Sequence, residues 1–455
     1  MSIASNPINN SGPTTMKSLL SLALLLSSIG RTVADNPIIQ TIYTADPAPY
    51  VYNDTIWLFA DHDEDAASSF FLMKEWRLYS STDVVNWQDW GTIASLAATF
   101  KWSTDRAWAP QTVYRDGTFY MYCPVQVSGG AMAIGVATSK TITGPYVDAL
   151  GKPLVQNNNI DPTVFIDDDG QAYLYWANPG LYYVKLNKDM ISYSGSVVSV
   201  SSKPSGLTEA PWFYKRNGKY YLAYASNGIP ESISYSTATG PTGPWTGKGG
   251  TIMAASGGSF TNHEGIVDYK NHSLFFYHNG ALPGGGGYHR SICIEDFTYG
   301  SDGSIPTLKM TTTGAAQIGS LNPYVQNSAT TIAYSSGVKT EKYSEGFMDV
   351  TNTNANGAYI KVKGVDFGSA GAASLSVRVA STGTGKLTAS LGSKTGTVVA
   401  TCTVASTGGT QKWQTVTCPV TGAKGKNDLY WTFSGSFGFA WWSFTAATVA
   451  REFEA

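Results

Sequence analysis

The sequence predicts an all-β protein, with a five-bladed β-propeller followed by a jelly-roll-like β-sandwich. An apolar strand, a tight Asn/Asp/Gly turn and an aromatic-rich return strand recur five times along the chain. The copies begin 48 to 62 residues apart, at Asp46, Trp108, Asp161, Glu209 and His263. A repeat of this length is typical of propeller blades. The pattern stops after Gly303, and short alternating strands with a different spacing begin at Val338, which is typical of a β-sandwich.

The fourth copy shows the repeated pattern in full. It has an apolar strand at Leu207–Tyr214, a turn at Asn217-Gly218 and a return strand at Tyr220–Leu222. Asn-Gly between two apolar runs is a strong hairpin signal. The outer strands also match, because the second copy contains Thr-Gly-Pro-Tyr at 143–146 and the fourth contains Thr-Gly-Pro-Trp at 242–245. The repeat therefore covers whole blades rather than single hairpins.

The composition agrees with a β-rich protein that has aromatic surfaces. The 455 residues include 13 Trp, 27 Tyr and 48 Gly, and 14% are charged, against about 25% in an average soluble chain. The 30 basic and 32 acidic residues leave a net charge of −2. Such a balance predicts neither a nucleic-acid partner nor binding to an anionic membrane surface. This profile is typical of a secreted protein that acts on carbohydrate.

The two ends of the predicted propeller define the domain organisation. An apolar run at Ser18–Leu26 follows Met16-Lys17, and the small residues of Thr32–Ala34 precede Asp35. This order predicts a secretory signal peptide over residues 1–34, and therefore a secreted, extracellular protein. We place the propeller at 35–312, a linker at 313–337 and the sandwich at 338–455. This apolar run is too short to span a membrane, and no other apolar run is long enough.

Export also makes a disulfide chemically possible. The chain has four cysteines, and Cys402 and Cys418 lie in consecutive predicted strands of the sandwich. We expect these two residues to form the disulfide.

Three of the five copies begin with a carboxylic acid, namely Asp46, Asp161 and Glu209. Equivalent positions around a pseudo-fivefold axis have similar depth and radius, so these acids are expected to converge on one pocket. Crowded carboxyls in a partly dry cavity do not all stay ionised, because each charge raises the pKa of its neighbours. A general acid and a general base can then coexist at one pH, as hydrolysis of a glycosidic bond requires.

The same residues also have structural interpretations. An Asp before Pro often caps its own turn, which is the alternative role for Asp46 and Asp161, whereas Glu is a poor turn former. Trp108 is either part of the core or an aromatic wall of a sugar site. His263, with Glu264 beside it, is either a buried hydrogen-bonded histidine or a residue that faces a central ion.

Together these motifs resemble glycoside hydrolase family 43, the five-bladed propeller β-xylosidases and α-L-arabinofuranosidases. The likeness covers roughly Asn36 to Thr312. It depends on Asp46-Pro47, Trp108-Ala109-Pro110, Asp161-Pro162, Glu209-Ala210-Pro211, His263 and His289-Arg290-Ser291.

The resemblance implies an inverting mechanism with Asp46 as general base and Glu209 as general acid. Asp161 would orient Glu209 and tune its pKa. The resemblance also implies that Arg290 hydrogen-bonds sugar hydroxyls and that His263 stands near a structural calcium ion at the propeller axis. No organic cofactor is expected. We assign Trp108, Trp76 and His289 to substrate binding as well.

The C-terminal part is similar to a family 6 carbohydrate-binding module. The likeness is carried by Val365–Gly368, Thr407–Trp413 and Trp441–Phe444. Two positions of the usual ligand cleft differ, because Thr410 stands where such modules commonly have Trp and Ala440 where Asn is usual. Tyr343, Trp413 and Trp441 are candidates for sugar contacts, with packing in the core as the alternative.

The predicted function is therefore the release of α-L-arabinofuranose from arabinoxylan-type hemicellulose by a secreted, monomeric hydrolase. A β-xylosidase or a bifunctional xylosidase/arabinofuranosidase is the main alternative, followed by an exo-arabinanase or a galactanase. A lectin-like propeller that only binds sugar is the non-enzymatic alternative. Three crowded carboxylates favour catalysis, since a pure binder gains little from them. The two pentoses are similar in size, and the sequence does not distinguish between them.

Overall fold

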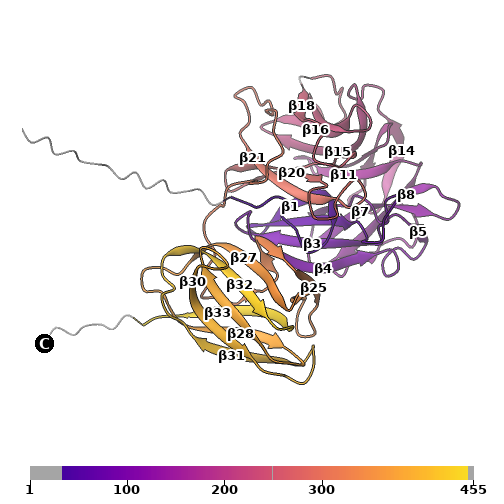
Figure 1. Cartoon of the computed structure of the whole chain (residues 1–455). Helices are drawn as coiled ribbons and strands as arrows, with labels where there is room; N and C mark the ends of the chain where they lie inside the picture. Colours follow the sequence, from indigo (N-terminus) through magenta and orange to yellow (C-terminus); the bar gives the residue numbers. More distant parts are fainter. Residues whose placement is uncertain (1–32, 248, 449–455) are drawn as a thin grey trace, which may run out of the picture. The chain divides into compact units, whose positions relative to one another are not determined.

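A computed structural model describes residues 33–247 and 249–448, and all regular structure in these ranges is β. Strands and their connections are the only elements drawn there (Figure 1). The predicted all-β class is thereby confirmed. Of the predicted signal peptide, residues 1–32 lie outside the described ranges. Within those ranges, no helix has the length and apolar character needed to cross a membrane.

The described strands form seven antiparallel sheets, of which five follow one another along residues 44–297. Sheet 1 contains β1 (Thr44–Tyr52), β2 (Thr55–His62), β3 (Glu75–Ser81), β4 (Trp87–Ser95) and the distant β23 (Thr331–Ile332). Sheet 2 contains β5 (Ser103–Asp105), β6 (Gln111–Arg115), β7 (Thr118–Val127), β8 (Met132–Ser139), β9 (Val147–Asp148) and β10 (Val155–Gln156).

The next three sheets contain fewer strands. Sheet 3 contains β11 (Ile160–Ile166), β12 (Ala172–Ala177), β13 (Leu181–Leu186) and β14 (Tyr193–Ser199). Sheet 4 contains β15 (Leu207–Arg216), β16 (Lys219–Ser226), β17 (Ser232–Ala238) and β18 (Gly250–Met253). Sheet 5 contains β19 (Gly265–Tyr269), β20 (His272–Asn279) and β21 (Ser291–Phe297).

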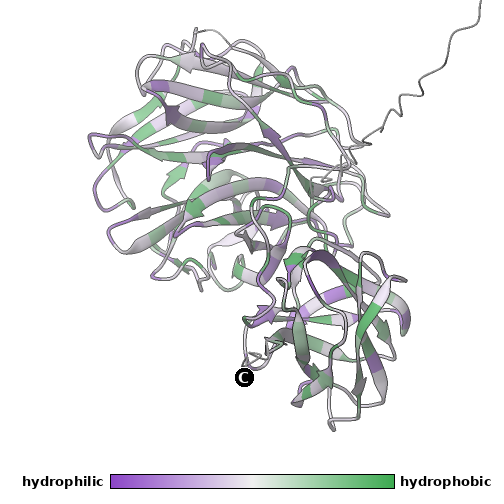
Figure 2. Ribbon diagram, turned by 90° about the vertical axis from the view of Figure 1, so that its left-hand side faces the viewer, coloured by the Kyte–Doolittle hydropathy of each residue, from purple (hydrophilic) through white to green (hydrophobic). Residues whose placement is uncertain are grey.

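The hairpins at the start of these sheets form for the local reasons that the sequence gives. In sheet 4, Asn217 and Gly218 have φ angles of 49° and 75°, as the tight turn of a two-residue hairpin requires. The return strand β16 is buried along nearly its whole length. Hydrophilic and hydrophobic segments are interspersed along the strands (Figure 2), as expected for strands whose successive side chains point to opposite faces.

A β-bulge interrupts the first strand of sheets 1, 3 and 4, at the Pro that the repeat contains. The strand registers shift between Ala45 and Ala48, between Ile160 and Thr163, and between Glu209 and Trp212. A Pro has no N–H to donate to the ladder, and the extra residue of a bulge absorbs this gap. Within these three bulges, the residues with positive φ are Asp46 (49°), Asp161 (57°) and Ala210 (52°).

The bulges show that one of the three acids does not occupy the same position in its strand as the other two. Asp46 and Asp161 correspond to Ala210 in backbone conformation, so Glu209 lies one residue before the position that the repeat assigns to it. The longer Glu side chain stands where the chain is still paired with β16, opposite Ala225.

Hydrogen bonds connect each of sheets 1 to 4 to the next sheet along the chain, and sheet 5 to sheet 1. They run from Tyr114 N to Tyr50 Oη (3.2 Å), from Val164 N to Gln111 Oε1, from Phe213 N to Thr163 Oγ1 (3.1 Å), from Trp212 Nε1 to Ile266 O (3.0 Å) and from Asp46 N to His278 Nδ1 (3.3 Å).

The C-terminal part consists of two sheets that share one core. Sheet 6 contains β22 (Asn327–Ser328), β25 (Val338–Lys342), β26 (Met348–Asn352), β28 (Ala372–Ala380), β31 (Trp413–Pro419) and β33 (Gly438–Ala446). Sheet 7 contains β24 (Tyr334–Ser336), β27 (Asn356–Asp366), β29 (Gly385–Leu391), β30 (Thr397–Val404) and β32 (Lys426–Ser434). Trp431 of sheet 7 and Trp442 of sheet 6 are fully buried in this core, with ring centroids 5.4 Å apart.

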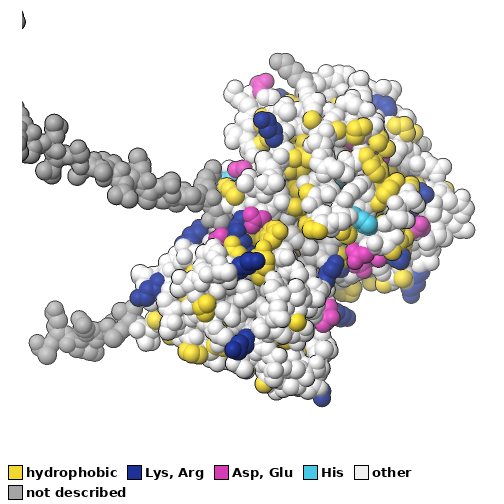
Figure 3. Space-filling model, viewed as in Figure 1, with side chains coloured by type: hydrophobic (Ala, Val, Ile, Leu, Met, Phe, Trp, Pro, Cys, Tyr) yellow, Lys and Arg dark blue, Asp and Glu magenta, His cyan; other side chains and the backbone are white. Residues whose placement is uncertain are grey.

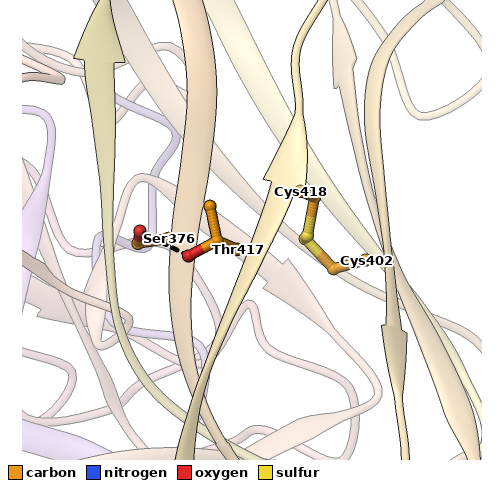
Figure 4. Close-up of a disulfide and its surroundings, with 4 residues drawn as sticks. All are labelled: Ser376, Cys402, Thr417 and Cys418. Atoms are coloured by element: carbon orange, nitrogen blue, oxygen red, sulfur yellow. Dashed lines mark hydrogen bonds between the residues drawn. A yellow bond between two sulfur atoms is a disulfide. The ribbon is translucent and has the colours of Figure 1, made fainter.

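The predicted disulfide is confirmed. Cys402 of β30 and Cys418 of β31 are bonded, with their Cα atoms 5.4 Å apart (Figure 4). The bond links the two sheets of the sandwich, next to a hydrogen bond between the hydroxyls of Ser376 and Thr417. The other two cysteines, Cys123 and Cys293, are buried and free.

Two of the three aromatic side chains considered as sugar contacts in the sandwich belong to its interior. Tyr343 and Trp413 are each 8% exposed and pack edge to face, with centroids 4.7 Å apart. The Trp413 indole N–H donates to Ser344 Oγ over 3.1 Å. Trp441 is half-buried and packs against this pair.

The segment expected to link the two parts is itself paired with strands. β23 extends sheet 1 by pairing with β4, while β22 and β24 pair with β33 and β27 of the sandwich. Asn86 adds two hydrogen bonds between the parts, donating to Lys363 O over 2.9 Å and accepting from Lys363 N over 2.8 Å. On the face shown in Figure 3, charged side chains are few and scattered, in line with the low charged fraction of 14%.

Candidate active site

A cavity of about 410 Å³ lies where the bulged strands of sheets 1, 3 and 4 begin. Acidic and basic groups line it, and they are Asp46, Asp161, Glu209, Glu231, His263 and Arg290. Aromatic side chains form much of the remaining wall, and they are Phe70, Phe71, Trp108, Phe260 and Tyr288. The volume is in the range of about 300–1,000 Å³ that small-molecule sites occupy. The three acids predicted from the repeat therefore face one cavity.

Asp46 is buried among positively charged and imidazole groups. Its Oδ1 accepts a hydrogen bond from Arg290 Nη1 over 3.0 Å. His278 accepts the Asp46 N–H at Nδ1, and its Nε2 lies 3.0 Å from Thr261 O. Burial alone would raise the pKa of Asp46, but the positive charge of Arg290 outweighs it and holds the pKa well below its usual range. Asp46 is thus an ionised carboxylate.

A second carboxylate fixes Arg290. Asp63 is fully buried and accepts from Arg290 Nε and Nη2, each over 3.0 Å, and from the Arg290 backbone N–H over 2.8 Å. The guanidinium also lies over the ring of Phe71, 4.6 Å from its centroid. A planar group held bidentately keeps its orientation, so Asp63 aims the remaining donors of Arg290 at Asp46.

Glu209 is in the opposite electrostatic situation. Burial, and then the negative charge of Asp46, raise the pKa of Glu209 to about 7. Its Oε2 accepts a hydrogen bond from Asn178 Nδ2 over 2.7 Å, which partly offsets the rise. Glu209 therefore keeps a proton up to neutral pH.

Asp161 touches the backbone that carries Glu209. Its Oδ2 accepts the N–H of Ala210 over 2.9 Å, at the bulge of β15. Burial, followed by the charges of Glu209 and Asp46, raises the pKa of Asp161 well above its usual range. Asp161 is thus placed to fix the backbone of Glu209 from the neighbouring sheet.

Several residues of the cavity were not found by sequence reasoning. Asn178 and Glu231 lie in a connection and at a strand end outside the repeated motif, and the buried Asp63, which holds Arg290, follows β2. For Glu231 a weak signal exists, because it follows Pro230 at the start of β17, as the acids at the bulges accompany a Pro. The aromatic residues Phe70 and Phe71 belong to a loop whose sequence has no recognisable pattern.

Two residues assigned to substrate binding lie outside this cavity. Trp76 is fully buried in β3, and its indole N–H donates to Trp108 O over 2.7 Å. Trp76 thus supports the wall residue Trp108 and does not face the cavity. His289 stacks on Tyr43 with ring centroids 4.7 Å apart, in a separate pocket that Pro283 and Lys339 also line. Trp108 and Arg290 do line the main cavity.

His263 lines the cavity close to Asp46, with its Nδ1 3.7 Å from Asp46 Oδ1. Burial lowers the pKa of His263 to about 4, so the ring is neutral at neutral pH. Both carboxyl oxygens of the adjacent Glu264 are buried without a hydrogen-bond partner.

These residues do not form a calcium cage by themselves. Calcium takes about six to eight oxygen ligands, and His263 supplies a nitrogen. Among the residues that the structure describes, no group of three or more His, Cys, Asp or Glu side chains is arranged to hold a metal ion. No step of the reaction considered below passes through a metal.

Comparison with known proteins identifies the family. The profile of the glycosyl hydrolases family 43 matches residues 34–305, which is more than half of the chain. The chain belongs to glycosyl hydrolase family 43. It is a glycoside hydrolase of the arabinofuranosidase/xylosidase type, and the family 43 region includes all the cavity residues described above. A second profile, that of the family 6 carbohydrate-binding module, matches residues 328–446.

Relatives of this family 43 chain span both parts. It is similar to an arabinoxylan arabinofuranohydrolase of Paenibacillus polymyxa, with 32% identity over 92% of this chain and 76% of the relative. The crystal structure of a Bacillus subtilis arabinoxylan arabinofuranohydrolase in complex with cellotetraose matches with a TM-score of 0.81 and 32% identity, covering 91% of this chain and 99% of that one.

A third similar protein matches a smaller share of this chain. It is a β-xylosidase/α-arabinofuranosidase from a compost microbial metagenome, in complex with xylotriose and in a calcium-free form. It matches with a TM-score of 0.56 and 27% identity, covering 61% of this chain and 98% of that one.

Proposed function

We propose that this family 43 enzyme is a secreted, inverting α-L-arabinofuranosidase that acts on arabinoxylan. The observation that carries the catalytic part is the contrast between Asp46 and Glu209 across one cavity. Arg290 holds Asp46 ionised, whereas burial and the Asp46 charge keep Glu209 protonated up to about pH 7. An ionised base beside a protonated acid is the combination that glycoside hydrolysis requires.

In the proposed reaction, Glu209 donates its proton to the departing glycosidic oxygen. Asp46 accepts a proton from the water that attacks the anomeric carbon on the opposite face, so one proton leaves Glu209 and one arrives at Asp46. Exchange with solvent restores both groups. Asp161 holds the Glu209 backbone through Ala210 N, and an aromatic wall that includes Trp108 packs against the sugar.

The inverting outcome has its own test. A water molecule fits between base and sugar only if the two carboxyls stand about 6.5–9.5 Å apart, against about 5 Å in retaining enzymes. Proton NMR of the first sugar released should show the β-anomer from an α-arabinofuranoside. A first product with retained configuration would remove the role of Asp46 as base.

The names of the relatives support the choice of sugar. Two proteins that share 32% identity with this chain across both of its parts are called arabinoxylan arabinofuranohydrolases. Purified enzyme should release arabinose, and not xylose, from arabinoxylan. It should also cleave nitrophenyl α-L-arabinofuranoside faster than nitrophenyl β-D-xyloside.

A β-xylosidase is the second candidate, because a protein named β-xylosidase/α-arabinofuranosidase is 27% identical to this chain and matches 61% of it. Release of xylose as the main product would support it. If neither aryl glycoside is cleaved while calorimetry detects binding of arabinoxylan oligosaccharides, the lectin-like alternative applies.

We infer further that sheets 1 to 5 are the blades of a closed five-bladed propeller. The chain of hydrogen bonds from each sheet to the next, and from sheet 5 back to sheet 1, supports this closure. Secretion is supported by the disulfide in the sandwich, since such bonds persist in oxidising compartments. Detection of the enzyme in the culture medium would test secretion, and light scattering would test the expected monomer.

A further inference from the structure

A fourth carboxyl faces the cavity and has no part in the reaction described above. Glu231 is 2% exposed and lies immediately before β17. Its Oε2 accepts the backbone N–H of Asn262 over 2.9 Å. In the described part of the chain, no hydrogen bond reaches its other oxygen, Oε1. General acid, general base and the positioning of the acid occupy three carboxyls, so the fourth needs another explanation.

Comparison with another buried glutamate of the same domain shows what is unusual. Glu295 is 7% exposed, and its two oxygens accept hydrogen bonds from Asn36, Tyr277 and Thr311. Such a residue is explained by the structure that it holds together. Glu231 has one oxygen bonded to protein and one that faces a cavity large enough for a sugar. Buried polar atoms are normally satisfied, so the partner of Oε1 is expected to come from the cavity.

The surroundings of Glu231 determine which kind of hydrogen bond it makes. Burial, and then the charge of Glu209, raise the pKa of Glu231 to about 9. Asp46 adds to this rise and Arg290 opposes it, and the carboxyls of Asp161 and Glu264 also face Glu231. Because Oε2 already accepts from Asn262 N, the proton of the neutral acid belongs on Oε1. The group then presents an O–H donor to the cavity.

We propose that Glu231 is a substrate-binding residue, whose Oε1–H donates a hydrogen bond to one hydroxyl of the sugar held beside Glu209. This inference rests on the proposed function, since it assigns the group that recognises the sugar of that same site. It assigns Glu231 to the recognition of one hydroxyl of that sugar. A site built around a hydrogen bond to a substrate hydroxyl discriminates strongly against an analogue that lacks it.

Two substitutions separate this role from a structural one. In Glu231→Gln, the amide oxygen can accept from Asn262 N and the NH₂ group can donate into the cavity. This variant should keep kcat/KM for nitrophenyl α-L-arabinofuranoside within roughly threefold of the wild type. Glu231→Ala removes the donor and should lower kcat/KM by roughly 10- to 100-fold, mainly through KM. Glu295→Gln is the matched control and should lower thermal stability with little change in KM.

A series of deoxy substrates identifies the hydroxyl. Wild type and Glu231→Ala are compared on 2-, 3- and 5-deoxy nitrophenyl arabinofuranosides. For one analogue, removal of the hydroxyl should lower kcat/KM of the wild type as much as Glu231→Ala lowers it on the parent sugar. On that same analogue, Glu231→Ala should lower kcat/KM little further. Equal effects of Glu231→Ala on all analogues, or an unchanged KM with only a lower Tm, would overturn the proposal. So would a loss in Glu231→Gln as large as that in Glu231→Ala, because it would show that a carboxylate acceptor is needed.

The failure of this inference is distinguishable from failure of the proposed function. If the wild type hydrolyses xylosides and not arabinofuranosides, the sugar was assigned wrongly, and the same variants are compared on deoxy-xylosides. If the wild type hydrolyses arabinofuranosides while the two Glu231 variants match it, only the role of Glu231 is wrong.

Discussion

Arg290 donates to Oδ1 of Asp46 from Nη1, over 3.0 Å, while its Nε and Nη2 donate to Asp63. The positive charge at this position keeps the proposed base ionised in a cavity that otherwise favours neutral carboxyls. Resemblance to the family implied that Arg290 binds sugar hydroxyls, and the structure adds that it also controls the charge state of Asp46.

Replacement of Arg290 should therefore change the acidic limb of the pH profile. In Arg290→Gln, Asp46 loses the charge that lowers its pKa, so it becomes protonated at a higher pH and kcat/KM falls already at mildly acidic pH. Arg290→Lys keeps the charge without the planar fork, and its acidic limb should move less. The measurement is kcat/KM of both variants between pH 3 and 8. An acidic limb that stays in place in Arg290→Gln contradicts this account.

The alkaline limb should report Glu209. Its pKa of about 7 predicts that kcat/KM falls as pH rises through this value, because the proton needed by the leaving group is lost. Asn178 Nδ2 donates to Glu209 Oε2 and so favours the ionised form. Asn178→Ala should therefore raise the pKa and move the alkaline limb to higher pH.

The control for this shift is Asn157→Ala. Asn157 accepts from the Trp176 indole over 2.9 Å and does not line the cavity. Asn157→Ala should therefore leave the alkaline limb of the pH profile unchanged. A shift of equal size in both variants would mean that Asn178 acts through general destabilisation.

Leaving-group dependence should separate Glu209 from Asp161. Glu209→Gln should reduce hydrolysis of arabinoxylan by about 10²- to 10⁴-fold, the usual contribution of general acid catalysis. A nitrophenyl glycoside needs little protonation and should lose far less. Asp161→Asn should reduce the hydrolysis of both substrates, since Asp161 fixes the backbone at Ala210. If the acidic phenol rescues Asp161→Asn and not Glu209→Gln, the two roles are reversed.

Loss of the disulfide should affect the sandwich and not the chemistry. Cys402 and Cys418 close a loop with a sequence separation of 16, and a cross-link of this length contributes about 3 kcal/mol to the free energy of unfolding. Cys402→Ser with Cys418→Ser should lower the Tm of the sandwich, while kcat on a small aryl glycoside stays the same. Ser376→Ala, which removes the adjacent hydroxyl hydrogen bond, is the control and should cost less than about 1.5 kcal/mol.

The β class and the hairpins were predictable because their causes are local. Asn217-Gly218 supports a tight turn wherever two apolar runs flank it, and Cys402 and Cys418 stand on strands that follow one another. The acids Asp46, Asp161 and Glu209 were found for a related reason, since a repeat places like positions together.

Other features depend on relationships that no local pattern carries. The one-residue offset of Glu209 shows in its spacing from Pro211, but the positive φ of Ala210 that accompanies it has no signal in the residue type. Glu231 lines the cavity from a strand end outside the repeat, and Asp63 holds Arg290 from the loop that follows β2. Trp76 was assigned to substrate binding, but it is buried in β3 and its indole N–H donates to Trp108 O.

The three bulges have a consequence for heat tolerance. Asp46, Asp161 and Ala210 all hold a left-handed backbone, which costs an L-residue roughly 1–2 kcal/mol, less for Asp, and costs glycine almost nothing. Glycine at the two Asp positions would thus release conformational strain and remove the functional carboxyl in the same step. Activity and thermostability oppose each other here, as in many enzymes whose functional residues are strained. At Asp46 and Asp161 this strain cannot be released without loss of the carboxyl, so a more heat-resistant form of the enzyme must gain its stability at other positions, for example at Ala210, in the sandwich or in the surface turns.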